Sequence, residues 1–165
     1  MGADGTDSLS IRGRSAQACG RVRRIRISAT TENEDILLRR SDLAAAKEAM
    51  TAAGFTHREI GGIDMFLDTP DAGPRHAVHV VFANEMVRPL EPMANPDVTE
   101  SEQSPPFQVL SLEAIARIKL TALCDKDRTH LRDLIGAGLI DARWPNRLPP
   151  VLAERLRQIL DTPES

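Results

Sequence analysis

Apolar positions in the first half of the chain form short runs separated by one helical stripe. Three apolar residues, Ile36 to Leu38, come directly after a short acidic segment. This pattern predicts a buried strand over residues 35–39. A helix over residues 41–53 follows, with Ser41 as its N-cap and Gly54 as its stop. Four apolar side chains of this helix recur at helical spacing and predict a buried stripe: Leu43, Ala46, Met50 and Ala53.

The next segments alternate between strand and turn signals. Residues 57–60 and 63–68 flank Gly61-Gly62, which predicts a hairpin with a two-residue turn. Residues 77–83 form the most apolar short run and predict a central strand. Residues 84–106 are rich in proline and glutamate, so we expect a long surface loop with at most a short turn of helix. A loop of that length in a compact domain is often functional.

The last third of the chain is predominantly helical in its pattern. Residues 107–110 predict a short strand, Ser111 caps a following helix, and residues 127–137 and 151–160 predict two more helices. The side chains expected to face the core, Cys124 included, are Leu112, Ile115, Ala116, Leu123, Cys124, Leu131, Leu134, Ile135, Leu152, Leu156, Ile159 and Leu160. The predicted fold class is α+β: a small mixed β-sheet, covered on one face by the early helix, and a helical C-terminal half.

The 165 residues suit a single domain, which we place at residues 29–165 after a poorly defined basic segment, residues 1–28. The arginines of that segment are Arg12, Arg14, Arg21, Arg23, Arg24 and Arg26. They form either a basic arm that touches phosphates or a solvated start to the chain. Within residues 15–27 the pattern is too short to decide between helix and strand.

The composition argues against a membrane protein, a secreted protein and a protein that stacks nucleic-acid bases. No apolar run approaches the roughly 20 residues of a membrane helix, and the chain does not start with an apolar secretory segment. The lack of such a run predicts no membrane association. Cys19 and Cys124 are isolated, without metal-ligand spacing, which favours a reduced cytoplasm. Aromatic residues make up only 3 % of the chain, so a base-stacking platform for single-stranded nucleic acid is not expected.

Three side chains are candidates for chemistry on the pattern alone. Asp35 lies at the mouth of a core strand, where a carboxylate can hold a divalent metal against a triphosphate, or can simply be solvated. His79, inside an apolar strand, is a metal ligand, a proton carrier or a core histidine with a polar partner. Lys119 either contacts a phosphate or lies along the edge of the apolar stripe.

A polar link between the last helices is also expected. Asp133 pairs with either Lys119 or Arg128 in this link, and Asp127 and His130 are expected to face solvent.

Three segments resemble the nucleotidyltransferase superfamily, most closely small bacterial nucleotidyltransferase-like proteins related to abortive-infection toxins. They are residues 33–43, 109–120 and 126–134, and the resemblance extends over roughly residues 13–161. The two C-terminal segments are the more specific. The resemblance implies a nucleotidyltransferase-like fold, Mg²⁺, and transfer of a nucleotidyl group from an NTP to a protein or RNA acceptor.

The resemblance also implies site residues. Gly13 and Ser15 occupy the place of the Gly-Ser pair that receives the triphosphate at a helix start, although Arg14 stands between them. Asn33 and Asp35 occupy the alternate positions of the metal-binding carboxylates, and His79 that of the third carboxylate. Asp35 is therefore the expected catalytic residue, and Lys119 an expected nucleotide contact.

The set of carboxylates is thus incomplete, because Asn and His stand where the family has acids. This predicts an impaired or inactive transferase. The alternative is a non-catalytic binding module on the same fold, of the toxin–antitoxin kind, that engages a protein or RNA partner through the arginine-rich start or residues 84–106. A third possibility is a remnant of the fold with no independent role, and the sequence leaves all three open.

Overall fold

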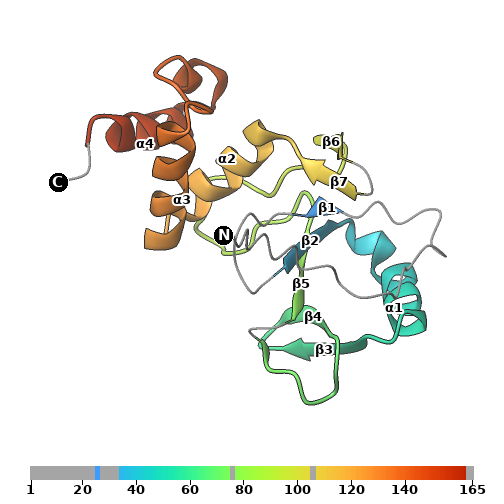
Figure 1. The fold of residues 1–165 in the computed structure, drawn as a ribbon. Helices are drawn as coiled ribbons and strands as arrows, with labels where there is room; N and C mark the ends of the chain where they lie inside the picture. The colour runs from blue at the N-terminus through green and yellow to red at the C-terminus, as the bar shows by residue number, and fades with distance from the viewer. Residues whose placement is uncertain (1–24, 27–33, 75–76, 105–106, 163–165) are drawn as a thin grey trace, which may run out of the picture.

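The computed structural model describes residues 25–26, 34–74, 77–104 and 107–162. One mixed sheet holds the strands in the order β3-β4-β5-β2-β1-β7-β6. The strands are β1 (Ile25–Arg26), β2 (Glu34–Leu38), β3 (Thr56–Ile60), β4 (Ile63–Leu67), β5 (Val78–Phe82), β6 (Ser101–Ser104) and β7 (Phe107–Leu110). The α-helices of the described part are α1 (Leu43–Ala52), α2 (Leu112–Ala122), α3 (Asp125–Gly136) and α4 (Pro150–Leu160), with 3-10 helices η1 (Arg40–Asp42) and η3 (Trp144–Arg147). The predicted α+β class is confirmed (Figure 1).

The register between β2 and β5 positions the candidate chemistry. These strands run parallel and pair along their whole length, from Glu34 opposite Val78 to Leu38 opposite Phe82. Asp35 is consequently the direct neighbour of His79 on the same face of the sheet. The prediction that residues 77–83 form a central strand is confirmed, since β5 lies between β4 and β2.

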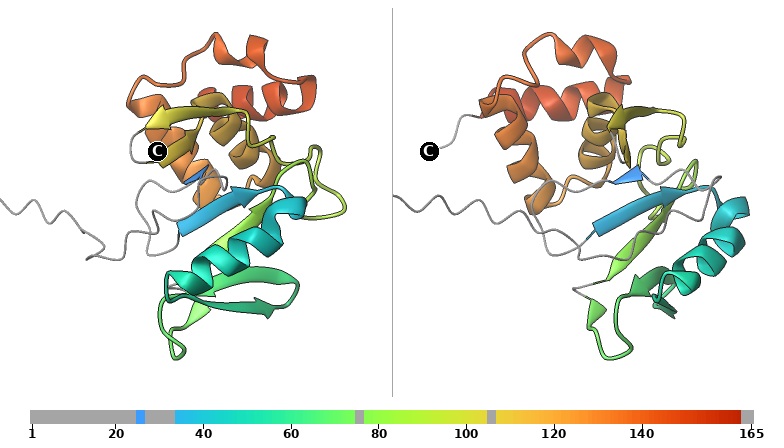
Figure 2. Two further views of the ribbon diagram at one scale, coloured as in Figure 1. Left: turned by 90° about the vertical axis from the view of Figure 1, so that its right-hand side faces the viewer. Right: turned by 45° about the vertical axis from the view of Figure 1, so that its right-hand side comes forward.

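Both faces of the central strands are covered by helix. Leu38 and Phe66 pack with Met50 of α1 on one face. Leu37, the residue before Leu38 in β2, packs with Ala114 of α2 on the other face. Figure 2 shows α1 and the C-terminal helices on different sides of the central strands. The expectation of a single covered face was therefore incomplete, because β2 and β5 are apolar at consecutive positions and need partners on both faces.

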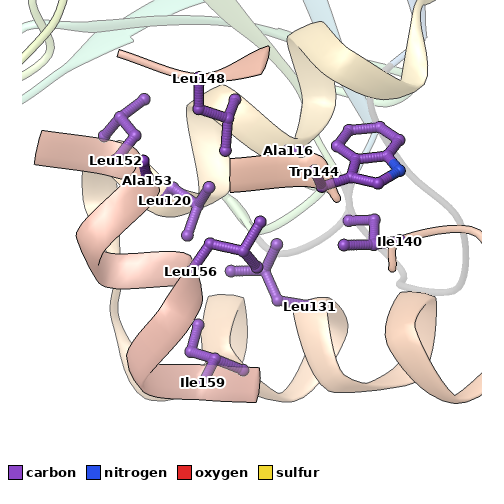
Figure 3. Close-up of a cluster of buried hydrophobic side chains, with 10 residues drawn as sticks. All are labelled: Ala116, Leu120, Leu131, Ile140, Trp144, Leu148, Leu152, Ala153, Leu156 and Ile159. Atoms are coloured by element: carbon purple, nitrogen blue, oxygen red, sulfur yellow. The ribbon is translucent and has the colours of Figure 1, made fainter. Parts of the chain in front are cut away.

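The helical half has its own core (Figure 3). Its buried side chains come from α2, α3, η3, α4 and the segments between them: Ala116, Leu120, Leu131, Ile140, Trp144, Leu148, Leu152, Ala153, Leu156 and Ile159. Arg155 of α4 donates hydrogen bonds to the carbonyls of Leu120 and Thr121, at 2.6 and 2.8 Å. These bonds satisfy two carbonyls at the end of α2 that have no partner within the helix.

Turn chemistry in the first half follows the prediction. Gly61 and Gly62 both have positive φ, 61° and 81°, as a type I′ hairpin turn requires. Gly54, with φ 91°, ends α1, and the amide of Phe55 donates to the carbonyl of Met50. Ser41 is different: its hydroxyl donates to Asp42, and the 3-10 turn of η1 precedes α1, so it does not cap the helix as predicted.

Residues 84–106 contain a strand that was not predicted. Residues Ser101–Ser104 form β6, which pairs antiparallel with β7 at the sheet edge. A strand of Ser, Glu, Gln and Ser carries no apolar alternation, so the sequence gives no periodic signal for it. Residues 84–100, which precede this strand, are joined to the rest of the fold by ion pairs and by a buried side chain. Arg39 binds Asp97 at 2.8 Å, Arg40 binds Glu85 at 2.6 Å, and Val98 is buried.

Two details of α3 also differ from prediction. The helix begins at Asp125, two residues early, because the Asp127 carboxylate accepts from the backbone amide of Cys124 in a capping box. Cys124 is exposed, not in the core, since the N-cap position places it outside the helical packing. Leu123 has a positive φ of 48° and makes the turn between α2 and α3 tight.

Candidate functional site

The candidate site begins with Asp35 and His79 on neighbouring strands. The Nδ1 atom of His79 lies 3.6 Å from Oδ1 of Asp35, beyond hydrogen-bond length but close enough for an ion pair. Their side chains are 24 % and 37 % exposed, so both remain accessible to a ligand. Burial raises the pKa of Asp35, and the charges of His79, Lys126 and Lys119 oppose that rise.

Two lysines of the helical half act electrostatically on Asp35. Lys119 lies in the last turn of α2 and Lys126 in the first turn of α3, and the field of each reaches the Asp35 carboxylate. Asp35 therefore interacts electrostatically with His79 and Lys119, two residues that the sequence had singled out separately from it. Carboxylate and imidazole come from the sheet, and the ammonium groups come from the helices.

Lys119 is held by contacts that were not predicted. Its Nζ lies 2.9 Å from Nδ1 of His130 and 3.6 Å from Oδ1 of Asp127. The expected pairs of Asp133 with Lys119 or Arg128 do not form. The tight turn at Leu123 sets the end of α2 against the first turns of α3, so Asp127 lies nearer to Lys119. His130 and Asp127 are accordingly half-buried and do not face solvent as expected.

Sequence reasoning missed Lys126 and His130 as members of this cluster. The available signal was the short connection between α2 and α3, from Leu123 to Cys124. A connection of two residues forces neighbouring helix ends together, so polar residues on each side of it meet. The expected site residues Gly13, Ser15 and Asn33 lie outside the described residues.

The donors in the described part do not fit Mg²⁺. No group of three or more His, Cys, Asp or Glu side chains that could hold a metal ion occurs there. Asp35 and His79 together supply one carboxylate and one imidazole. Mg²⁺ prefers oxygen ligands in octahedral geometry, whereas imidazole suits transition metals. One carboxylate and one imidazole therefore do not complete a Mg²⁺ site.

A second polar cluster lies on the face of the sheet opposite to Asp35 and His79, and its contacts join elements of the fold. The buried Asp64 carboxylate lies 2.6 Å from Nε2 of His57 and 3.5 Å from Nζ of Lys47. Met65 pairs with His79 and shares its face, so Asp64 points to the other face, toward α1. These contacts fasten α1 to the β3–β4 hairpin and leave the Asp35 site unaffected.

Comparison with known proteins gives no relative: no protein-family model, curated protein or solved structure matches this chain. Within the part that the structure describes, the helices are too short or too polar to cross a membrane.

Proposed function

We propose that this chain is a nucleotidyltransferase-like protein that binds the phosphates of an NTP between Lys119, Lys126 and the Asp35–His79 pair. The observation that carries the proposal is the pair of Asp35 and His79, 3.6 Å apart on neighbouring strands, with the charges of Lys119 and Lys126 acting on its carboxylate. The resemblance of residues 33–43, 109–120 and 126–134 to nucleotidyltransferases supports it, because each segment contributes to the cluster.

The chemistry follows from the charges of the cluster. In nucleotidyl transfer, an acceptor hydroxyl of a protein or RNA forms a bond to the α-phosphorus, and the bond to the leaving pyrophosphate breaks. Lys119 and Lys126 offset the charge on the phosphates. His79 takes the hydroxyl proton, and the neighbouring Asp35 carboxylate stabilises the imidazolium that forms. Transfer is impaired, since a single carboxylate stands where the family uses two or three.

A non-catalytic binding module on the same fold is the second candidate. It is favoured by the described donor set, which does not fit Mg²⁺. Three exposed apolar side chains on the segment after β5 support a partner surface there: Met86, Val87 and Leu90. In this role the fold binds a protein or RNA, and the nucleotide is not consumed.

Calorimetric titration tests both candidates. The protein is titrated with ATP, CTP, GTP and UTP, with and without Mg²⁺, beside Asp35→Ala and Lys119→Met. Arg157→Met, which removes an exposed cation of α4, is the matched control. We expect at least one nucleotide to bind, with affinity about tenfold lower in Lys119→Met and unchanged in Arg157→Met, because a phosphate contact is charge-assisted.

Asp35→Ala separates the two candidates. Mg²⁺-dependent binding that disappears in this variant supports the transferase, and it would mean that Asp35 holds a metal that the described donors alone do not fit. Binding that survives it, with or without Mg²⁺, supports the binding module. No heat and no thermal shift with any nucleotide, from a folded sample, would exclude nucleotide binding.

A further inference from the structure

The contact between Lys119 and His130 fixes the chemical state of the histidine. A lysine ammonium has three donors and no acceptor, so Nδ1 of His130, 2.9 Å away, must accept the hydrogen bond. An imidazole that accepts at Nδ1 is neutral and carries its proton on Nε2. The geometry therefore selects one tautomer and one charge state of His130.

We infer that His130 is a positioning residue for Lys119: its neutral Nδ1 and the Asp127 carboxylate hold the ammonium where it contacts nucleotide phosphate. This inference rests on the proposed function, because it assigns regulation to the same site. Protonation of His130 removes the acceptor and places two positive charges side by side. Lys119 is then released from its position, and nucleotide affinity falls as the pH falls.

The surroundings of His130 support this arrangement. The charged groups that act on it are Lys119 of α2, and Lys126, Asp127 and Asp133 of α3. Burial, followed by the charges of the two lysines, lowers the pKa of His130, while the two aspartates oppose that shift. Lys119 and Asp127 are each only 17 % exposed, so solvent screens their charges incompletely. The neutral form is thus the one that the fold favours.

The direction of the pH effect distinguishes positioning from simple electrostatics. If His130 acted only through its charge, protonation would add a positive charge near the phosphates and strengthen the binding of an anion. Positioning predicts the opposite, because the ammonium that contacts the phosphate loses its anchor. The sign of the change in affinity therefore decides between the two roles.

The first experiment needs no nucleotide. NMR of the ¹⁵N-labelled protein reports the tautomer and the pKa of His130, in the wild type and in Lys119→Met. We expect a proton on Nε2 in the wild type and a higher His130 pKa in Lys119→Met, since the like charge is gone. A proton on Nδ1, or a pKa unchanged by the substitution, would overturn the inference.

The second experiment measures ATP affinity by calorimetry in the wild type, His130→Gln and His130→Ala, from pH 7.5 down to a pH below the His130 pKa that NMR gives. Glutamine offers an uncharged acceptor at every pH, so the ratio of wild-type to His130→Gln affinity cancels the protonation of ATP itself. We expect that ratio to fall about fivefold as the pH falls, and His130→Ala to bind about fivefold more weakly at pH 7.5.

A ratio that stays constant or rises at low pH would overturn the positioning role. Absence of binding of ATP, CTP, GTP and UTP in every variant would overturn it together with the proposed function. In that case the NMR result shows which part fails, because the Lys119–His130 contact stands or falls without nucleotide.

Discussion

At the residue scale, the burial of Asp35 disfavours its ionised form in the folded protein. Burial raises its pKa, so the folded state binds a proton more readily than the unfolded chain does. A pKa that is higher in the folded state stabilises the fold at pH values below the pKa of the unfolded chain. This contribution is lost as the pH rises through the pKa of the folded state. At neutral pH the ionised Asp35 is therefore destabilising, which is typical of a residue kept for function.

We predict that Asp35→Asn raises the free energy of unfolding at pH 7, because asparagine is a neutral isostere of the protonated acid. The gain shrinks at acidic pH, where the wild-type side chain is itself protonated. Denaturant unfolding of both proteins at several pH values measures this difference. A loss of stability at pH 7 would mean that the ion pair with His79 outweighs burial.

Asp97→Asn is the matched control with the opposite sign. Hydrogen bonds, led by those from Arg39, hold the pKa of Asp97 well below its usual range. A lowered pKa contributes stability above the unfolded value, and this is lost as the pH falls toward the folded pKa. Asp97→Asn should therefore be destabilising at pH 7, with an effect that diminishes in acid.

The position of a residue is easiest to predict where a strand carries it. Asp35 and His79 could be paired in principle, since alternation within β2 and β5 fixes the faces of both. His130 and Lys126 were missed because their role depends on the left-handed turn at Leu123, where a leucine gives no sign of positive φ. Polar contacts that depend on one such turn cannot be read from periodicity.

At the element scale, Arg155 adds hydrogen bonds to the apolar packing of α4 against α2. The guanidinium of Arg155 donates to two carbonyls there, and Arg157, two residues on, makes only an exposed pair with Glu154 at 3.5 Å. We predict that Arg155→Met lowers the free energy of unfolding by about 1.5–3 kcal/mol, the usual effect of charge-assisted hydrogen bonds. Arg157→Met should change it by less than about 0.5 kcal/mol.

Chemical denaturation of both variants checks this prediction, with far-UV circular dichroism to confirm that each still folds. Equal effects of the two substitutions would contradict the capping role of Arg155. The comparison is well matched, because both variants remove one arginine from the same helix and keep a long apolar chain in its place.

Elements with strong periodicity or turn chemistry were predicted with bounds close to those observed. The apolar stripe of α1 and the Gly61-Gly62 turn follow directly from side-chain spacing and glycine's positive φ. β6 and η1 were not predicted, since a polar edge strand and a single 3-10 turn lack either signal. The specific nucleotidyltransferase-like fold rests on resemblance and stays a proposal.

At the scale of the whole molecule, α2 joins the two parts that build the site. Ala114 packs in the cluster on the sheet, and Leu120 packs in the cluster of the helical half. Asp35 and His79 belong to the sheet, Lys119 lies on α2, and His130 lies on α3 in the helical half. The spacing between the acidic and basic groups is therefore set by α2, and the site exists only while both clusters are folded.

This shared helix predicts that the molecule unfolds in one transition. Leu38→Ala in the sheet and Leu131→Ala in the helical half each remove a side chain that is at most 2 % exposed, so each should cost about 2–5 kcal/mol. Trp144, the single tryptophan, reports the helical half by fluorescence, while circular dichroism reports the entire chain. For both variants the two signals should shift together, with an unchanged dependence on denaturant. If Leu38→Ala moved the dichroism transition and left the Trp144 transition in place, the two halves would unfold separately, and ligand binding would then have to assemble the site from both.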